Sequence, residues 1–168
     1  MSEEPASTAA EAKALWRRLA PIYRTWSMLW DSFVARESWG AVGVDLTTGV
    51  IESRKARKVA AVLRGASGPA LDAVVTIAQV NAERATAIFR NVAIMYVTLP
   101  IAALALMSDA APEIVQRFLT ENADDVLFWV ILLSTTPIMF FAFMWRAKQL
   151  AWSIELARSG AVEPLEPK

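Results

Sequence analysis

Two long stretches without any charged side chain are the strongest pattern in this sequence. The first is residues 91–108, which are rich in Ile, Val, Leu, Ala and Met, and the second is residues 126–145. As helices rising 1.5 Å per residue they would extend about 27 Å and about 30 Å, close to the thickness of a bilayer's hydrocarbon core. The pattern predicts an all-α membrane protein whose two transmembrane helices form a hairpin.

The alternative is a soluble bundle that buries both stretches. The chain has 168 residues, of which 55% are hydrophobic, and a mean hydropathy of +0.36. A soluble domain of this size buries too small a fraction of its surface to enclose two such helices, so we favour the bilayer. The seven Trp residues agree with this choice, because an indole ring suits the membrane–water boundary.

Basic residues flank the two stretches unequally and predict their orientation. Arg84 and Arg90 precede the first stretch, and Arg146 and Lys148 follow the second. The connection, residues 109–125, carries one Arg against five acidic residues. The positive-inside rule then places both termini in the cytoplasm and the acidic connection outside, as for a multi-pass protein of a bacterial inner membrane.

These observations divide the chain into five segments. Residues 1–68 are expected to form cytoplasmic amphipathic or interfacial helices and a basic segment. Residues 69–108 are expected to form one long helix from the cytoplasm through the first span, because no Gly or Pro interrupts them until Pro100. The external connection (109–125), the second span (126–145) and a cytoplasmic helix end with a tail (146–168) follow.

Aromatic residues lie where contacts with a membrane or a partner are expected. Trp129 and Trp145 are near opposite ends of the second stretch, as interfacial anchors are. Nearer the amino terminus, recurrence at three- and four-residue steps predicts an amphipathic helix, interrupted at most at Pro21. Its aromatic face should lie either in the cytoplasmic leaflet or against a partner protein. This face comprises Trp16, Leu19, Tyr23, Trp26, Trp30, Phe33 and Val34.

The connection contains a helical pattern of its own. Pro112 suits a first helical turn and Asn122 suits a helix end. The pattern predicts a short amphipathic helix on the outer surface, which either docks a partner or, as we prefer, only closes the hairpin. Its apolar face comprises Ile114, Val115, Phe118 and Leu119.

A basic cluster occupies residues 52–64, where five basic residues accompany one acid. A juxtamembrane cluster of this kind attracts anionic lipid headgroups, so we predict headgroup contacts for Arg54, Lys55, Arg57 and Lys58. Nucleic acid binding is a weaker alternative, because no aromatic residues are interleaved with the charges. A merely solvated helix face is, together with lipid contact, the default interpretation.

A stripe of mostly apolar residues follows the long predicted helix at heptad-like steps. It could be a coiled-coil seam with Asn81 as a polar register residue, or a face that packs on the amino-terminal helices. Because two positions are Ala, we favour close packing. The stripe comprises Leu71, Val74, Ala78, Asn81, Ala85, Ile88 and Val92.

Each predicted span contains one proline, Pro100 or Pro137, and we expect a kink at each. Within a bilayer, neighbouring helices and hydroxyls such as those of Thr98 and Thr135 can satisfy the carbonyls that the prolines free. Together with Asn81, these four residues are predicted to mediate helix packing rather than to line a pore.

Composition excludes most catalytic chemistry. The chain has neither Cys nor His, which removes disulfides, thiolate nucleophiles, iron–sulfur clusters, thiolate zinc sites and imidazole acid–base catalysis. Neither span contains an ionisable residue, which argues against a self-sufficient pump or transporter. We therefore predict no catalytic residue, no metal and no cofactor, while contacts with pigment, quinone or lipid stay open.

The function that these patterns favour is a non-catalytic accessory or structural subunit of a larger integral-membrane complex. Its expected partners are the lipid bilayer and other integral-membrane subunits or further copies of itself. The alternative is a homo-oligomeric pore or membrane-permeabilising effector, in which faces bearing Thr would line a channel.

Overall fold

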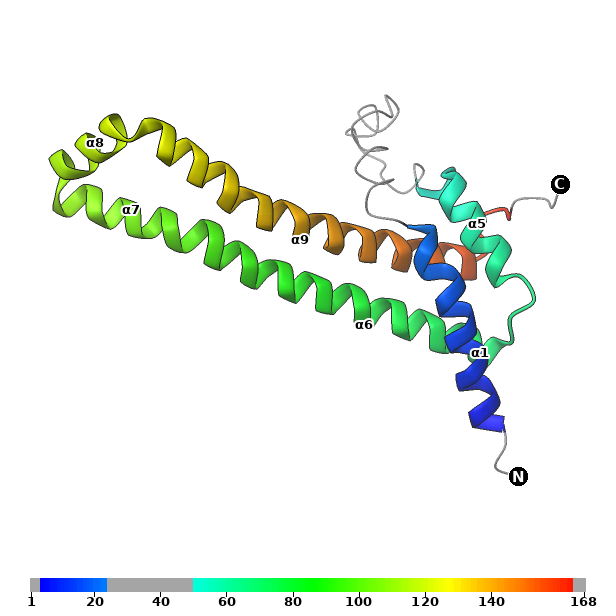
Figure 1. The fold of residues 1–168 in the computed structure, drawn as a ribbon. Helices are drawn as coiled ribbons and strands as arrows, with labels where there is room; N and C mark the ends of the chain where they lie inside the picture. Colours follow the sequence, from blue (N-terminus) through cyan, green and yellow to red (C-terminus); the bar gives the residue numbers. More distant parts are fainter. Residues whose placement is uncertain (1–3, 24–49, 165–168) are drawn as a thin grey trace. The chain divides into compact units, whose positions relative to one another are not determined.

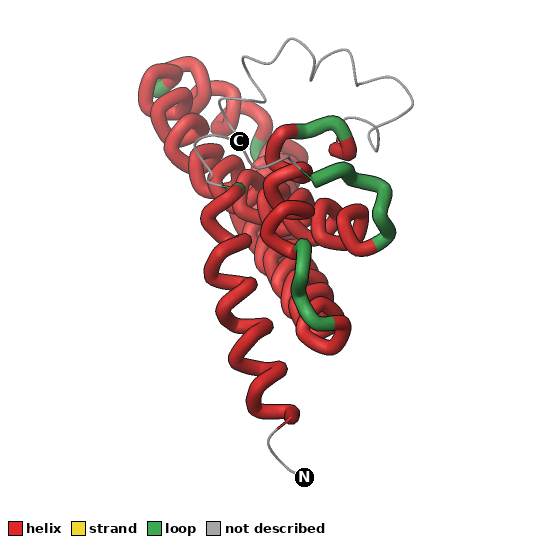
Figure 2. Tube along the Cα trace, turned by 90° about the vertical axis from the view of Figure 1, so that its right-hand side faces the viewer, coloured by secondary structure: helices red, strands yellow, loops and turns green. Residues whose placement is uncertain are grey.

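The computed structural model describes residues 4–23 and 50–164 (Figure 1). Within these two ranges all secondary structure is helical, without a strand (Figure 2). Residues 24–49, with the predicted contacts at Trp26, Trp30 and Phe33, lie outside the described residues. The helices are α1 (Glu4–Leu19), η1 (Ala20–Ile22), α5 (Arg54–Leu63), α6 (Gly68–Ala93), η2 (Ile94–Thr98), α7 (Leu99–Ala110), α8 (Pro112–Glu121) and α9 (Ala123–Arg158).

The prediction of an all-α fold is confirmed for the described residues. Two of its helices are long and apolar enough to cross a membrane: Gly68–Ala110, which unites α6, η2 and α7, and Ala123–Arg158. The chain divides into two compact units, unit 1 with residues 1–83 and 145–168, and unit 2 with residues 84–144. The chain leaves unit 1 within α6 and returns to it within α9.

Unit 1 is organised around a hydrophobic core to which four helices contribute. In α5 the apolar positions recur at three- and four-residue steps, so one face is buried while Arg54, Arg57 and Lys58 face solvent. Leu19, Val59, Val74 and Ile154 are the largest apolar side chains that are completely buried. The core contains Ala12, Leu15, Leu19, Tyr23, Val59, Leu63, Ala70, Val74, Val75, Ala78, Leu150, Ala151 and Ile154.

The amino-terminal helix is interrupted at Pro21, which is the position where the sequence allows an interruption. Helix α1 stops at Leu19, and Pro21 lies in the 3-10 turn that follows. Proline has no N–H, and its ring would clash with the Arg17 carbonyl four residues before it, so the α-helix does not continue. The aromatic face is also covered differently: Tyr23 is 3% exposed in the core of this same chain, and Trp16 packs against that core. Tyr23 is therefore not available to lipid or to a partner.

The stripe along α6 is divided by the fold. Leu71, Val74 and Ala78 pack into the core of unit 1, as the close-packing prediction requires. Their use in a coiled-coil seam is wrong, because helices of the same chain cover them. Farther along, Asn81 and Ile88 are exposed.

Helix Gly68–Ala110 contains one irregular turn, η2, just before Pro100. There the Leu99 N–H donates to the Ile94 carbonyl, five residues back, which is the π-helical pattern. Pro100 cannot donate to the Tyr96 carbonyl, and its ring needs additional room there. The wider π turn supplies that room, and the kink at Pro100 stays a prediction.

Pro137 lies inside α9, which continues through it. The carbonyl that loses its helical donor is that of Leu133, four residues earlier. The Thr135 hydroxyl instead donates to the Ile131 carbonyl at 2.9 Å. The prediction that Thr135 satisfies the freed carbonyl is therefore wrong, because a threonine hydroxyl in a helix reaches only three or four residues back.

The end of α9 is fixed by a glycine in the left-handed region. Helix α9 ends at Arg158, and Gly160 has a φ of +76°. The Gly160 N–H donates to the Ala157 carbonyl at 3.2 Å, and the Ala161 N–H donates to the Leu156 carbonyl at 3.1 Å. This pair of bonds is the Schellman motif, which satisfies carbonyls at a helix end.

We expect Gly160→Ala to destabilise unit 1 by about 1–2 kcal/mol, because a Cβ disfavours this backbone conformation. No atom lies within 4 Å of the added Cβ, so the cost comes from the backbone alone. The turn also returns the chain so that Val162 packs on Ala56 and Ala60. Urea unfolding in mild detergent, followed by circular dichroism, measures the loss. Gly68→Ala, which has open space and no positive φ, is the control, and an equal loss there would contradict the prediction.

Candidate functional site

The helices of unit 2 carry most of their large apolar side chains on the outside. In the most apolar 18 residues of helix Gly68–Ala110, no residue is buried. In the most apolar 18 residues of helix Ala123–Arg158, 11% are buried. The described part of the chain therefore does not enclose these helices in a soluble core. We call the following exposed side chains the apolar surface: Ile94, Met95, Val97, Leu99, Ile101, Leu104, Leu106, Met107, Leu127, Phe128, Val130, Ile131, Leu132, Ile138, Met139, Phe141 and Phe143.

The two predicted aromatic anchors of α9 differ in their surroundings. Trp129 is 57% exposed and meets the Phe128 ring edge-on, with 5.9 Å between ring centroids. Trp145 is half-buried in unit 1 and meets Trp152 edge-on at 6.1 Å. The Trp129 ring is therefore mostly exposed, whereas the Trp145 ring is partly covered by Trp152.

The residues predicted to mediate helix packing are mostly exposed. Asn81, Thr98, Pro100 and Thr135 lie on the surface, and Pro137 is half-buried. Packing between helices of this chain therefore does not use the first four. Their packing against helices of another chain stays a prediction.

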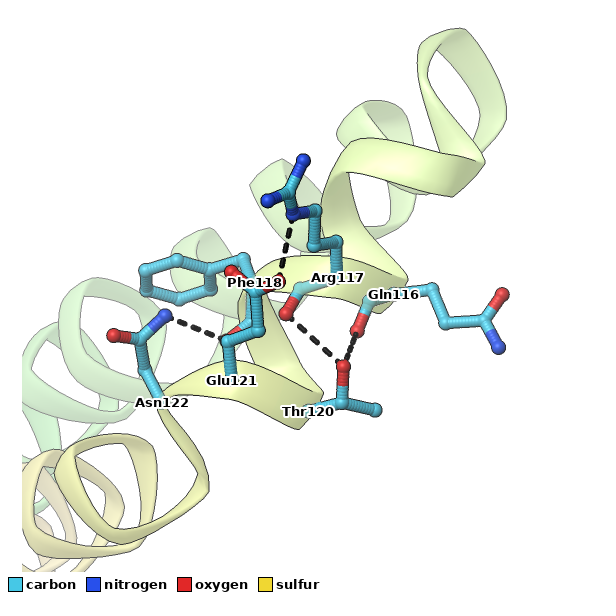
Figure 3. Close-up of polar contacts among 6 residues, drawn as sticks. All are labelled: Gln116, Arg117, Phe118, Thr120, Glu121 and Asn122. Carbon is cyan, nitrogen blue, oxygen red and sulfur yellow. Dashed lines mark hydrogen bonds and ion pairs between the residues drawn. The ribbon is translucent and has the colours of Figure 1, made fainter.

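Helix α8 covers the residues for which a short amphipathic helix is predicted. Val115 is buried, whereas Ile114 and Phe118 are exposed. Four polar side chains, those of Arg117, Thr120, Glu121 and Asn122, bond within the helix and its end (Figure 3). These bonds join Arg117 Nε to Glu121 Oε1 at 2.7 Å, Thr120 Oγ1 to the carbonyls of Gln116 and Arg117, and Asn122 Nδ2 to the Phe118 carbonyl.

Helix α5 holds the predicted basic cluster on one side. Its amino terminus is capped by the Ser53 hydroxyl, which accepts from the Ala56 N–H at 3.1 Å. Arg54, Arg57 and Lys58 are exposed on the side opposite the buried face. These three residues, which we call the basic face of α5, are three of the four predicted headgroup contacts.

The fourth predicted headgroup contact, Lys55, lies elsewhere. Its ammonium group is 5.8 Å from the centroid of the Tyr23 ring, which is a cation–π distance. The Tyr23 hydroxyl hydrogen-bonds Ser153, whose own hydroxyl also lies 2.8 Å from the Gln149 carbonyl. Burial raises the pKa of the Tyr23 phenol, although its hydrogen bonds to Ser153 and Ser53 oppose this. Tyr23 therefore stays neutral and joins η1, α5 and α9.

Polar links between distant segments of unit 1 were not predicted from the sequence. The Arg146 guanidinium donates to the Ala20 carbonyl at 2.8 Å, which places a cation at the end of α1. Asp72 and Arg158 form an ion pair at 2.9 Å. The sequence gives no signal for these polar links. It does show a three- and four-residue spacing of apolar residues after Trp145, which predicts that the second apolar helix continues as an amphipathic helix.

A carboxylate of α1 caps the start of α6. Glu11 accepts from the Ser67 N–H at 3.0 Å and from the Ser67 hydroxyl at 2.7 Å, one residue before α6 begins at Gly68. The hydrogen bonds from the Ser67 hydroxyl and then from its N–H lower the pKa of Glu11 below its ordinary value of 4.5. The helix dipole favours the same ionised form.

We expect Glu11→Gln to destabilise unit 1 at neutral pH. The pKa of Glu11 is lower in the folded state, so ionised Glu11 stabilises the fold fully above about pH 4.5 and progressively less as pH falls through the lowered pKa. The difference in melting temperature between wild type and variant should therefore shrink below about pH 4.5. Thermal unfolding in detergent at several pH values measures it. Glu83→Gln is the control, and a difference independent of pH would contradict the prediction.

Among the described residues, no group of three or more His, Cys, Asp or Glu side chains could hold a metal ion. Three surfaces have been described above: the apolar surface, the basic face of α5 and the exposed side of α8. No protein-family model, curated protein or solved structure matches this chain.

Proposed function

We propose that this chain is a non-catalytic subunit of a larger integral-membrane assembly, anchored by unit 2 as a two-helix transmembrane hairpin. The observation that carries the proposal is the outward orientation of the apolar surface. Removing a large aliphatic or aromatic side chain from water is worth about 1.5–3 kcal/mol, so this surface strongly favours a bilayer or apolar partner helices over water.

The distribution of charge supports an orientation with both termini in the cytoplasm of a bacterium. Arg84 and Arg90 border one apolar helix and Lys148 follows the other, whereas the connection is acidic. Unit 1 is then the cytoplasmic part, with a core of its own.

Polar groups on the apolar surface support a protein partner in addition to lipid. Asn91 and Thr98 are exposed among apolar neighbours. Lipid chains cannot hydrogen-bond these groups, whereas side chains of a neighbouring helix can. The Thr135 hydroxyl already donates to the Ile131 carbonyl, so that position suits an apolar contact.

Two measurements test the proposal. The chain has no Cys, so single cysteines at Ser7 and Thr120 can be labelled without background. In intact cells, an impermeant maleimide is expected to label Thr120→Cys and to label Ser7→Cys only after the membrane is permeabilised. Purification from native membranes in mild detergent, followed by mass spectrometry, should recover membrane subunits with the chain. A homogeneous monomer with no co-purifying subunit would overturn the proposal.

The alternative is a homo-oligomeric pore, favoured by the exposed hydroxyl residues Thr98 and Ser134. Reconstitution of the purified chain into planar bilayers distinguishes the two functions. Discrete conductance steps from the chain alone would support the pore. Their absence at high protein-to-lipid ratio supports the subunit.

A further inference from the structure

Helix α5 is fixed so that its basic face points away from the protein. Val59 and Leu63 lie in the core of unit 1, whereas Ala56 and Ala60 pack against Val162. With this side held, Arg54, Arg57 and Lys58 are presented together on the opposite side. The fold therefore orients the charges in advance, and binding need not order the helix itself.

The charge on this face is of one sign. Residues 54–63 contain four basic residues and no Asp or Glu. Lys55 lies over the Tyr23 ring, which leaves Arg54, Arg57 and Lys58 as the exposed set, with Arg64 exposed just beyond the helix. Because the formal net charge of the whole chain is zero, an anionic partner must be attracted by such a local patch.

The chain also keeps α5 close to the apolar helices in sequence. Helix α5 ends at Leu63, and α6 begins at Gly68. Gly65, with a φ of +86°, provides a tight turn between them. The helix that begins with α6 then continues to Ala110. If unit 2 is inserted in a bilayer, the basic face is covalently tethered to that bilayer through α6, whose residues from Gly68 to Asn91 extend about 34 Å as a helix.

We propose that the basic face of α5 binds the anionic phosphate headgroups of the membrane in which unit 2 is anchored; this inference rests on the proposed function. A lipid surface fits better than nucleic acid, because the exposed side chains of this face are cationic and α5 has no aromatic side chain that could stack on bases. A bilayer surface also requires only charge, which Arg and Lys both supply. The contact would hold unit 1 to the leaflet and set its orientation.

The test uses the full chain in nanodiscs of phosphatidylcholine containing a minor fraction of phosphatidylglycerol. Lipids retained on the protein after release into the gas phase are counted by native mass spectrometry. Arg57→Gln/Lys58→Gln should reduce the preference for phosphatidylglycerol about 25-fold, or about fivefold for each charge removed. Lys13→Gln/Arg117→Gln removes the same pair of residue types from α1 and α8 and should leave the preference unchanged. Arg57→Lys should retain it.

The outcomes are separable. Unchanged preference in Arg57→Gln/Lys58→Gln, with circular dichroism confirming its helices, would overturn the inference while leaving the proposed function intact. An equal loss in the control pair would also overturn it. Loss of binding to a labelled RNA duplex without loss of phosphatidylglycerol preference would assign the face to nucleic acid instead. If the wild type fails to enter nanodiscs, the proposed function fails, and the inference, which rests on it, fails with it.

Discussion

Ile138→Arg should prevent stable membrane integration of the second apolar helix. Ile138 is 61% exposed near the middle of residues 126–145, so the new guanidinium would face lipid. An arginine at the centre of a transmembrane helix costs about 2.5–3.5 kcal/mol, and the favourable contribution of the isoleucine is lost as well. We therefore expect the integrated fraction to fall by a hundredfold or more relative to the non-integrated form.

Alkaline carbonate extraction of membranes, combined with maleimide labelling of Thr120→Cys, measures this change. Ile114→Arg on α8 is a matched control, because Ile114 is 68% exposed but lies outside both uncharged stretches. That variant should remain in the membrane pellet. If Ile138→Arg is as resistant to extraction as the wild type, this helix does not span the bilayer.

The apolar helices were predictable because their signal is local. Residues 91–108 and 126–145 lack charge, and no distant contact is needed to recognise that. The proline at position 112 likewise predicts the start of α8 correctly. The turn at Gly65 and the start of the long helix at Gly68 were also predictable. Each depends on only a few adjacent residues.

The packing of unit 1 was not predictable by the same reasoning. An amphipathic face indicates that residues such as Leu19 and Tyr23 need cover, but it does not identify what covers them. Their actual neighbours include Ser153 and Ile154, at least 130 residues away in the chain. The cap that Glu11 provides to Ser67 is also a contact between distant segments, and no spacing rule predicts it.

Of the candidate surfaces, the basic face of α5 was predictable from local sequence, whereas the position of Lys55 depends on contacts between distant segments. Three of the four predicted headgroup contacts form the basic face of α5, because a helix of period 3.6 places residues 54, 57 and 58 together. Lys55 lies about 100° away around the helix, where the Tyr23 ring happens to be. Helical periodicity therefore predicts the basic face of α5. The contact of Lys55 with Tyr23 depends on how η1 packs against α5, which periodicity does not predict.

Unit 1 should depend on Leu19 more than on most single side chains. Leu19 is completely buried, in a core that also contains Val59, Val74 and Ile154. Leu19→Ala would leave a cavity where these helices meet, which typically costs about 2–5 kcal/mol. In mild detergent, the amides of α1 and α5 should therefore exchange with deuterium about 30-fold faster or more if exchange proceeds through unfolding of unit 1.

Hydrogen exchange resolved by peptide separates this effect from unit 2. Leu106→Ala is the matched control, because Leu106 is 72% exposed and its truncation removes no packing within the chain. That variant should leave the exchange of α1 and α5 unchanged. If Leu19→Ala prevents purification, Ile154→Val offers a smaller cavity, with an expected cost of about 0.5–1.5 kcal/mol. Equal exchange in wild type, Leu19→Ala and Ile154→Val would mean that these helices do not share a core, and the tethered position of the basic face of α5 would lose its support.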